Sequence, residues 1–312
     1  MLTCHPNICI SPEGSWLIKL YPRYYGVVLT DECLETFADD LLATPKIEGW
    51  TLDRSGLWEY LKRMRPQDYA SLTACVYQYY TDRHQPGKQR WGDKNNYYLD
   101  YIQLIATLFP NALFLHIVRD GRDVACSYRD LSETKAEYAP NLPASVCGAT
   151  LDWVGNENTI QKSFNAIDTA RTCTVRYEDL TQHPQETLRA VCTFINEPYD
   201  ENMLAFAEVN RKMSLEPEMF MVWKDRTKEP VTAKRVGRWR REMFQEDQFL
   251  FQLIAKKQLA GYGYDVASPR IRLLPATILW AYAMTTVSYS RVSSLALRLQ
   301  RVIHLLFKKR NQ

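Results

Sequence analysis

The sequence predicts an α/β fold built around a parallel β-sheet. Two stretches carry this prediction, because residues 89–131 and residues 172–195 each place a short apolar strand shortly before a helix. Such alternation is typical of parallel sheets, in which each return to the same end of the sheet needs a crossover connection. The composition agrees, since 46% hydrophobic and 24% charged residues are ordinary values for a globular chain of 312 residues.

The N-terminal part of the chain is expected to be mostly helical. Over residues 15–85, apolar side chains recur at helical spacing, as at Leu57, Tyr60, Leu61 and Met64. No strand is predicted before residue 89.

The predicted strands and helices then follow one another along the chain. A strand over 89–93, a helix over 97–108, a strand over 113–118 and a helix from Gly121 to about residue 131 form the first run. The second run is a strand over 172–176, a turn over 177–180 and a helix over 184–195 with proline in its first turn. Residues 225–242 are expected to form a loop, and a helix over 246–259 is expected to end with Gly261 as its C-cap.

The distribution of charge divides the chain into a domain at 1–267 and a tail at 268–312. The net charge is +3, and the eight bases beyond Asp265, where no acid follows, leave −5 for residues 1–265. Residues 273–290 carry no charge, and the segment from Arg291 separates an apolar face from a basic one. This pattern predicts an amphipathic helix at an anionic membrane surface; the alternative is a C-terminal helix packed on the core.

Composition also bears on cofactors, partners and location. The eight cysteines form no C-x-x-C pair and no zinc-like spacing with histidine, so reduced thiols and no metal are expected. The small net charge argues against nucleic acid as a partner. No signal peptide is visible, and we expect a cytoplasmic protein with peripheral membrane attachment through the tail.

The sharpest local feature is the segment VRDGRDVACS, Val118–Ser127. Arg119 ends a predicted strand, and Ser127 lies about one turn into the next helix, at the strand end where α/β proteins bind ligands. Both side chains could contact one phosphate near the N-terminus of that helix. The alternative is that the charged residues of this segment form surface ion pairs.

Lys94, in the segment WGDK, follows another predicted strand. A single lysine at such a position is most often a solvated charge. Two basic strand ends in one crevice favour an oxyanion ligand.

Four sequence segments, in the same order along the chain, resemble segments of a known family. WGDK, FPNALFLHIVRDGRDVACS, VRYEDLTQHPQETL and VGRWRREM are similar to blocks of the sulfotransferases that use 3′-phosphoadenosine-5′-phosphosulfate, especially the branch that includes the protein-tyrosine sulfotransferases. The resemblance spans roughly residues 1–265 and implies a three-layer fold of the P-loop type. It implies that Arg119 and Ser127 bind the 3′-phosphate of the donor, that Lys94 assists the sulfuryl group, and that Tyr177 and Arg238 lie at the donor.

The opening segment, MLTCHPNICISPEGSW, resembles the family's segment that ends the first helix and leads to a glutamate. In the tyrosine-sulfotransferase branch that glutamate takes the acceptor's proton, which implies Glu13 as the base; otherwise Glu13 is a surface carboxylate. His5 is the alternative base, although it could instead cap a helix end. Trp16, Tyr21, Tyr24 and Tyr25 could line an acceptor groove or simply pack.

The family's first strand and its loop of the type P-x-R-S-G-T-T, which holds the 5′-phosphosulfate, have no counterpart in this sequence. We expect the chain to be a fragment or an incomplete gene product that opens inside the helix after that loop. The resemblance implies sulfuryl transfer to an acceptor hydroxyl or amine on a carbohydrate, a lipid or a protein tyrosine. The alternative is a degenerate, non-catalytic protein that binds nucleotide or membrane.

Overall fold

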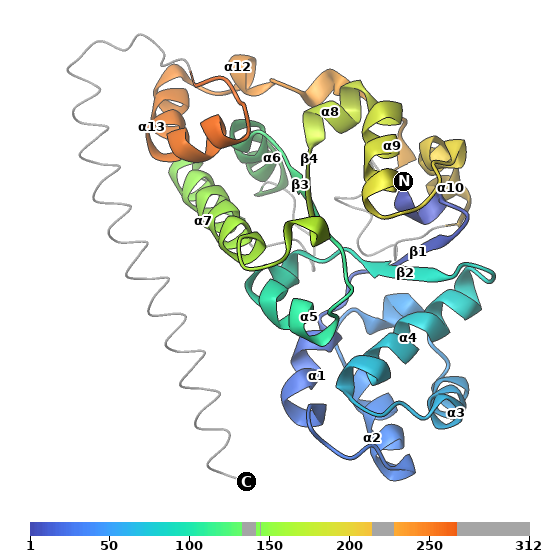
Figure 1. Cartoon of the computed structure of the whole chain (residues 1–312). Coiled ribbons are helices and arrows are strands. Elements are labelled where there is room, and N and C mark those ends of the chain that lie inside the picture. The colour runs from blue at the N-terminus through green and yellow to red at the C-terminus, as the bar shows by residue number, and fades with distance from the viewer. Residues whose placement is uncertain (133–141, 144, 214–227, 267–312) are drawn as a thin grey trace, which may run out of the picture. The chain divides into compact units, whose positions relative to one another are not determined.

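The computed structural model describes residues 1–132, 142–143, 145–213 and 228–266. These residues form two compact units (Figure 1). The first comprises residues 1–118, 158–213 and 228–233, and the second comprises residues 119–132, 142–157 without 144, and 234–266. The predicted tail at 268–312, including the uncharged stretch 273–290, lies outside the described residues.

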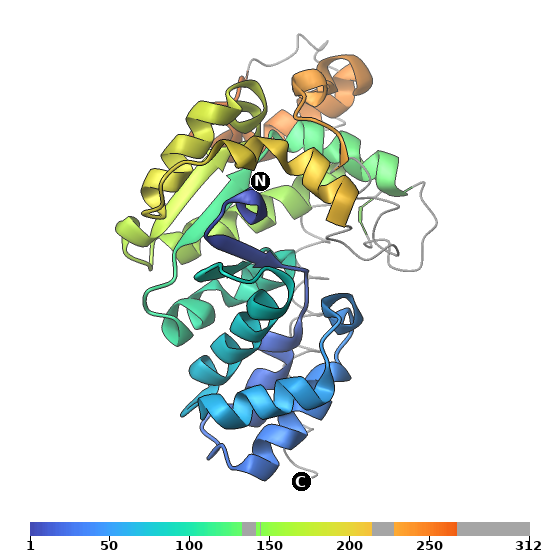
Figure 2. The same ribbon diagram turned by 90° about the vertical axis from the view of Figure 1, so that its right-hand side faces the viewer.

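Four helices of the first unit gather into a bundle, as Figures 1 and 2 show: α1 (Trp16–Tyr24), α2 (Asp31–Leu42), α3 (Arg54–Met64) and α4 (Tyr69–His84). A short 3₁₀ turn, η2 (Ile47–Trp50), lies between α2 and α3. Side chains fix the helix starts, because Thr30, Asp53 and Asp68 each accept a hydrogen bond from a backbone N–H of the first turn. The predicted helical character of residues 15–85 is confirmed.

The first unit also contains two short parallel sheets. β1 (Ile8–Ser11) pairs with β2 (Arg90–Asp93), and β3 (Phe114–Val118) pairs with β4 (Thr172–Arg176). The α/β class and the three strands predicted from the sequence are therefore confirmed. Two results differ from expectation: among the described residues the strands form two pairs rather than one sheet, and β1 lies in a segment where no strand was predicted.

The remaining helical segments of the first unit either precede β1 or follow one of the strands. They are η1 (Leu2–Cys4), η3 (Asn96–Tyr101), α5 (Ile102–Leu108), η4 (Thr169–Arg171), α8 (Tyr177–Gln182), α9 (Pro184–Phe194), η5 (Glu201–Ala205) and α10 (Phe206–Met213). The expectation of a turn over 177–180 was wrong, since α8 begins there. Glu178 and Asp179 in its first turn favour a helix start by their interaction with the helix dipole.

The second unit is helical. It holds α6 (Gly121–Ser132), most of α7 (Val146–Phe164), η7 (Ala233–Arg235) in part, α12 (Trp239–Glu242) and α13 (Gln245–Gly261). The segment predicted as a loop over 225–242 thus contains two short helical turns within its described part. Gly261 is still helical, and the left-handed glycine that follows α13 is Gly263, with φ of +73°.

Gly121 begins α6 where there is no room for a side chain. A Cβ atom there would lie 2.5 Å from the ring of Trp153 and 2.6 Å from that of Phe251. Those two rings are in contact with each other, with centroids 5.9 Å apart. The glycine of the R-D-G segment is therefore required by packing inside the second unit.

Within the described part of the chain, no helix combines the length and the apolar character needed to span a membrane.

Candidate active site

Glu13 and Lys94 form an ion pair in the first unit, although 81 residues separate them in the sequence. A second lysine, Lys46, places its Nζ 3.9 Å from the other carboxylate oxygen of Glu13. The Lys94 side chain is 61% exposed and that of Glu13 is 20% exposed, so a ligand can reach the pair from solvent.

The pairing of β1 and β2 explains why these two residues meet. In the parallel register Ser11 is the partner of Asp93, and each is the last residue of its strand. Lys94 follows β2 directly, and Glu13 follows β1 after Pro12. Because the carboxyl ends of parallel strands lie at one edge, the two side chains emerge together.

Buried polar contacts lie behind this pair. The hydroxyl of Tyr77 donates a 2.6 Å hydrogen bond to the carboxylate of Asp93. Burial raises the pKa of Asp93 to about 7, and the nearby Glu13 carboxylate acts in the same direction, while the hydroxyls of Tyr77 and Tyr98 oppose the shift. Asp93, which lies beside the Glu13–Lys94 pair, therefore tends to be neutral near physiological pH.

In the second unit, Arg119 and Ser127 are in contact. A guanidinium nitrogen of Arg119 donates to Ser127 Oγ at 3.3 Å, and Ser127 Oγ donates to the carbonyl oxygen of Asp123 at 3.0 Å. Another nitrogen of Arg119 donates to the carbonyl oxygen of Arg235 at 3.1 Å. The two residues that the sequence assigned to one phosphate therefore lie side by side.

Helix α6 also holds the segment around Gly237. The carboxylate of Asp123 accepts hydrogen bonds from the backbone N–H groups of Gly237 at 2.7 Å and Trp239 at 3.0 Å. Asp130, two turns further along α6, pairs with Arg235 at 2.7 Å and with Arg238 at 2.8 Å. Arg238 is buried, so its side chain is committed to contacts within this unit.

The alternative of surface ion pairs in the R-D-G-R-D segment was wrong for three of its members, because Asp120, Arg122 and Asp123 are all buried. Asp120 and Arg122 do pair with each other, in a two-pronged arrangement at 2.9 and 2.7 Å, but both are buried. The guanidinium of Arg122 also lies 3.7 Å from the centre of the Trp239 ring. Arg122 is therefore a structural cation.

Tyr177 is the first residue of α8 and is half-buried. It belongs to the first unit, whereas Arg119, Ser127 and Arg238 belong to the second.

His5 is fully buried and has a structural role. Its Nε2 lies 2.8 Å from the carbonyl oxygen of Pro198, which can only accept, and its Nδ1 accepts from the backbone N–H of Asn7 at 3.1 Å. These contacts define a neutral imidazole protonated on Nε2. Both ring nitrogens are occupied, so the geometry favours Glu13 over His5 as a base.

The aromatic residues considered for an acceptor groove divide into two groups. Trp16 and Tyr24 are buried in the core of the bundle, and Trp16 packs against Trp50 and Tyr77. Tyr25 is exposed, and its ring lies beside that of Tyr21 in a tilted arrangement. For Trp16 and Tyr24, packing is the role that the structure shows.

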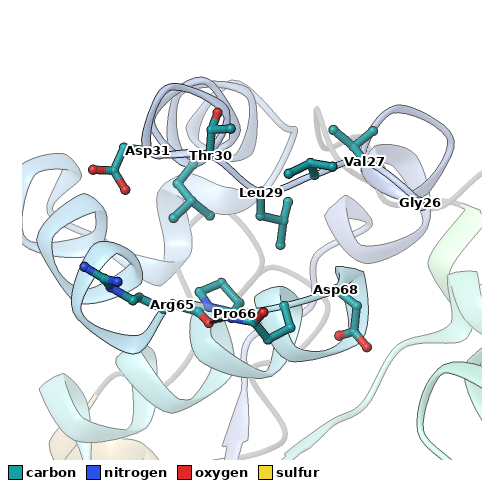
Figure 3. A pocket seen from close by; sticks show the side chains of 11 residues that line it. Gly26, Val27, Leu29, Thr30, Asp31, Arg65, Pro66 and Asp68 are labelled. Carbon is teal, nitrogen blue, oxygen red and sulfur yellow. Dashed lines mark hydrogen bonds between the residues drawn. The ribbon is translucent and has the colours of Figure 1, made fainter.

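A surface hollow of about 540 Å³ lies elsewhere in the bundle (Figure 3). It is lined by the connection 26–31, by Leu34 and by the connection 65–68. None of the residues assigned to donor or catalysis lines it. Among the residues that the structure describes, no three histidine, cysteine or acidic side chains come together as a metal site.

Asp123, Asp130 and Tyr77 are residues that sequence reasoning did not single out. The two aspartates had a sequence signal, since they lie seven residues apart on one helix, on the same face as the intervening Ser127. Tyr77 had none, because nothing in its local sequence distinguishes it from the neighbouring tyrosines of α4.

Comparisons with known proteins bear on this geometry. The sequence profile described as "Sulfotransferase family" matches residues 1–201, which is more than half of the chain. The chain is 25% identical over 176 residues to "Protein-tyrosine sulfotransferase 1" of Danio rerio, covering 55% of this chain and 48% of that protein. It is 24% identical over 191 residues to a "Putative protein-tyrosine sulfotransferase" of Caenorhabditis elegans, covering 60% of this chain and 71% of that protein.

The match to the zebrafish protein thus spans about half of that protein's length, and the matches to an uncharacterized Aquifex aeolicus protein and to the Drosophila melanogaster protein-tyrosine sulfotransferase span 19% and 27% of theirs. Among solved structures, the sulfotransferase domain of the Synechococcus PCC 7002 olefin synthase superposes with a TM-score of 0.56 at 18% identity, covering 85% of this chain and 88% of that one. The sulfotransferase domain of the curacin biosynthetic pathway gives 0.50 at 16% identity, covering 85% and 91%. These two likenesses show the fold.

Proposed function

Since this chain belongs to the sulfotransferase family, we propose that it transfers a sulfuryl group from 3′-phosphoadenosine-5′-phosphosulfate to an acceptor hydroxyl or amine. The observation that carries the proposal is the Glu13–Lys94 pair at the carboxyl ends of β1 and β2. It joins a base and a cation at an exposed edge, which is the pair of groups that such a transfer needs.

Each member of the pair has a separate role. Glu13 accepts the proton of the acceptor as the new oxygen–sulfur or nitrogen–sulfur bond forms. Lys94 stabilises the negative charge on the bridging oxygen as its bond to sulfur breaks. The ammonium groups of Lys94 and Lys46 both lie beside the carboxylate of Glu13, so the base and the cation are adjacent.

The donor contributes an activated sulfuryl group, and four residues are assigned to it. Arg119 and Ser127 hold its 3′-phosphate, supported by their mutual contact, which places a guanidinium and a hydroxyl side by side. Tyr177 and Arg238 are assigned to the donor on the resemblance of their sequence blocks. The buried position of Arg238 favours a supporting contribution, in which it keeps the 235–239 segment on α6.

For the acceptor, we favour a protein tyrosine over a carbohydrate or a lipid headgroup. The support is that relatives from four animal species carry the name protein-tyrosine sulfotransferase, two of them as putative. A cytoplasmic chain attached to anionic membrane through its basic tail remains part of the proposal and rests on the sequence alone.

The test is transfer of radiolabelled sulfuryl from the donor to a tyrosine-containing acidic peptide, with carbohydrate and lipid acceptors in parallel. Glu13→Gln and Lys94→Ala should each lower turnover by about 100-fold or more. Lys62→Ala is the matched control, because Lys62 is another exposed lysine paired with a carboxylate, that of Asp31, on the helical bundle. Binding of 3′-phosphoadenosine-5′-phosphate without turnover on any acceptor would instead support the degenerate, non-catalytic protein.

A further inference from the structure

Two buried tyrosines contact the residues next to Glu13 and Lys94 in the chain. The hydroxyl of Tyr77 contacts Asp93, the residue before Lys94, and the hydroxyl of Tyr98 contacts Gly14, the residue after Glu13. We propose that Tyr77 and Tyr98 are positioning residues that keep Glu13 and Lys94 in register for the reaction. This inference rests on the proposed function, and it assigns residues that do not themselves touch the substrate.

Tyr77 is fixed on α4 by aromatic rings on several sides. Its ring stacks on Trp91 of β2, with centroids 4.4 Å apart and planes 5° from parallel. Trp16 and Trp50 lie 5.1 and 5.5 Å away. Because these rings leave the tyrosine little freedom, its hydroxyl is a fixed point for the carboxylate at the end of β2.

Tyr98 is fixed in η3, directly after the loop that carries Lys94. Its hydroxyl donates to the carbonyl oxygen of Gly14 at 2.9 Å, and the side-chain amide of Asn95 donates to the same oxygen. The segment Pro12–Gly14 is thereby fastened to the segment that carries Lys94. Gly14 has no room for a side chain, because an added Cβ atom would lie 2.9 Å from the ring of Trp16.

A carboxylate and a lysine on two connections can drift apart when a ligand enters between them. Buried hydrogen bonds resist this, because breaking one leaves an unsatisfied polar group in an apolar surrounding. Displacements of about 1 Å at reacting groups cost up to about 100-fold in rate. Loss of either hydroxyl should therefore let Glu13 and Lys94 shift apart and should lower the rate of turnover.

The experiment compares Tyr77→Phe and Tyr98→Phe with two matched controls in the full chain. Tyr60→Phe removes a hydroxyl that contacts Asp82, and Tyr69→Phe removes a buried hydroxyl that contacts the carbonyl oxygen of Leu17. Each control removes a tyrosine hydroxyl from a helix of the bundle, and that hydroxyl hydrogen-bonds to Asp82 or Leu17 and not to a residue beside the pair. All four variants are assayed below their midpoints of thermal unfolding.

The first readout is independent of activity. Competitive acylation followed by mass spectrometry measures how fast Lys94 reacts, and an ammonium held against a carboxylate reacts slowly. We expect acylation of Lys94 to rise about threefold or more in Tyr77→Phe and Tyr98→Phe and to stay unchanged in the controls. Unchanged acylation in both test variants, or an equal rise in the controls, overturns the positioning role whether or not the wild-type chain is active.

The second readout is turnover with the donor and the tyrosine peptide. We expect kcat to fall about tenfold in both test variants while KM for the donor stays within about twofold. A fall in kcat that the controls share is a loss of stability and counts against the inference. A wild-type chain without turnover contradicts the proposed function, and the acylation rates then decide the positioning role separately.

Discussion

Arg119 donates a hydrogen bond to the hydroxyl of Ser127 at 3.3 Å, across eight residues of a strand-to-helix connection. The serine hydroxyl donates its own hydrogen bond to the carbonyl oxygen of Asp123 and accepts the one from Arg119. These contacts, with the one from Arg119 to the carbonyl oxygen of Arg235, hold the half-buried Arg119 at the start of α6.

Two ligands that differ in the 3′-phosphate can separate a role of Arg119 in nucleotide binding from a purely structural role. Arg119→Ala should weaken binding of 3′-phosphoadenosine-5′-phosphate by about 1.5–3 kcal/mol, the scale of a hydrogen bond to a charged group. Binding of adenosine-5′-phosphosulfate, which lacks the 3′-phosphate, should hardly change. Calorimetry with both ligands decides the point, and equal losses would mean that Arg119 acts only in the structure of the second unit.

Gly121 should be intolerant of a single added methyl group. Gly121→Ala places a Cβ against Trp153 and Phe251 and should lower the free energy of unfolding by about 1–3 kcal/mol, as overpacking does. Gly155→Ala is the control, because that helical glycine has open space around it and should gain about 0.5–1 kcal/mol from a better helix former. Denaturant unfolding measures both, and a stabilised Gly121→Ala would contradict the packing.

Asp123 holds the 235–239 segment through two backbone N–H groups. Asp123→Asn turns an N–H donor toward those donors in place of an oxygen, and it should lower the free energy of unfolding by about 1.5–3 kcal/mol. The exposed Asp100 gives the control, since Asp100→Asn should change that free energy by no more than about 0.5 kcal/mol. Hydrogen exchange at Gly237 and Trp239 should quicken only in the Asp123 variant.

The sequence could predict elements whose signals are local. The apolar strand over 172–176 has the predicted bounds, and α9 begins at the predicted Pro184. The helix starts at Asp31, Arg54 and Tyr69 follow polar caps that the sequence displays. β1 escaped prediction because Ile8–Ser11 is only four residues long and lies between two prolines, too short to establish a period.

The candidate site was predictable in part, because some of its residues lie next to strands that have a local sequence signal. Lys94, Arg119 and Ser127 follow or flank visible strands, so their strand-end positions could be inferred. The meeting of Glu13 with Lys94 required β1, and the burial of Asp120 with Arg122 required the fold of the second unit. Charged residues are mostly exposed, and only tertiary contacts reveal an exception.

The buried carboxyl of Asp93 should make stability depend on pH. Its pKa is about 7 in the folded chain, against an ordinary value near 3.8, because burial disfavours the charged form. A raised carboxyl pKa means that the folded state binds the proton more tightly, so the stability contributed by neutral Asp93 is complete below about pH 4 and is lost as pH rises through about 7.

Asp93→Asn removes that titration and keeps an oxygen for the Tyr77 hydroxyl. At about 1.4 kcal/mol for each pH unit between the two pKa values, wild type should lose up to about 4 kcal/mol relative to the variant between about pH 4 and pH 7.5. Urea unfolding across this range measures the difference. Parallel curves for the two proteins would show that Asp93 is ionised throughout.

The basic tail gives a prediction that depends on sequence alone. Beyond Asp265 lie eight bases and no acid, and the segment from Arg291 alternates an apolar with a basic face at helical spacing. A basic residue near an anionic bilayer contributes about 1 kcal/mol, and burial of the apolar face adds a contribution that salt does not screen. The full chain should therefore float with anionic vesicles and only weakly with neutral ones, and added salt should reduce the binding without abolishing it. A chain ending at Ala267 should remain unbound, and if it floats as well as the full chain, or if neither floats, the tail has no role at the membrane.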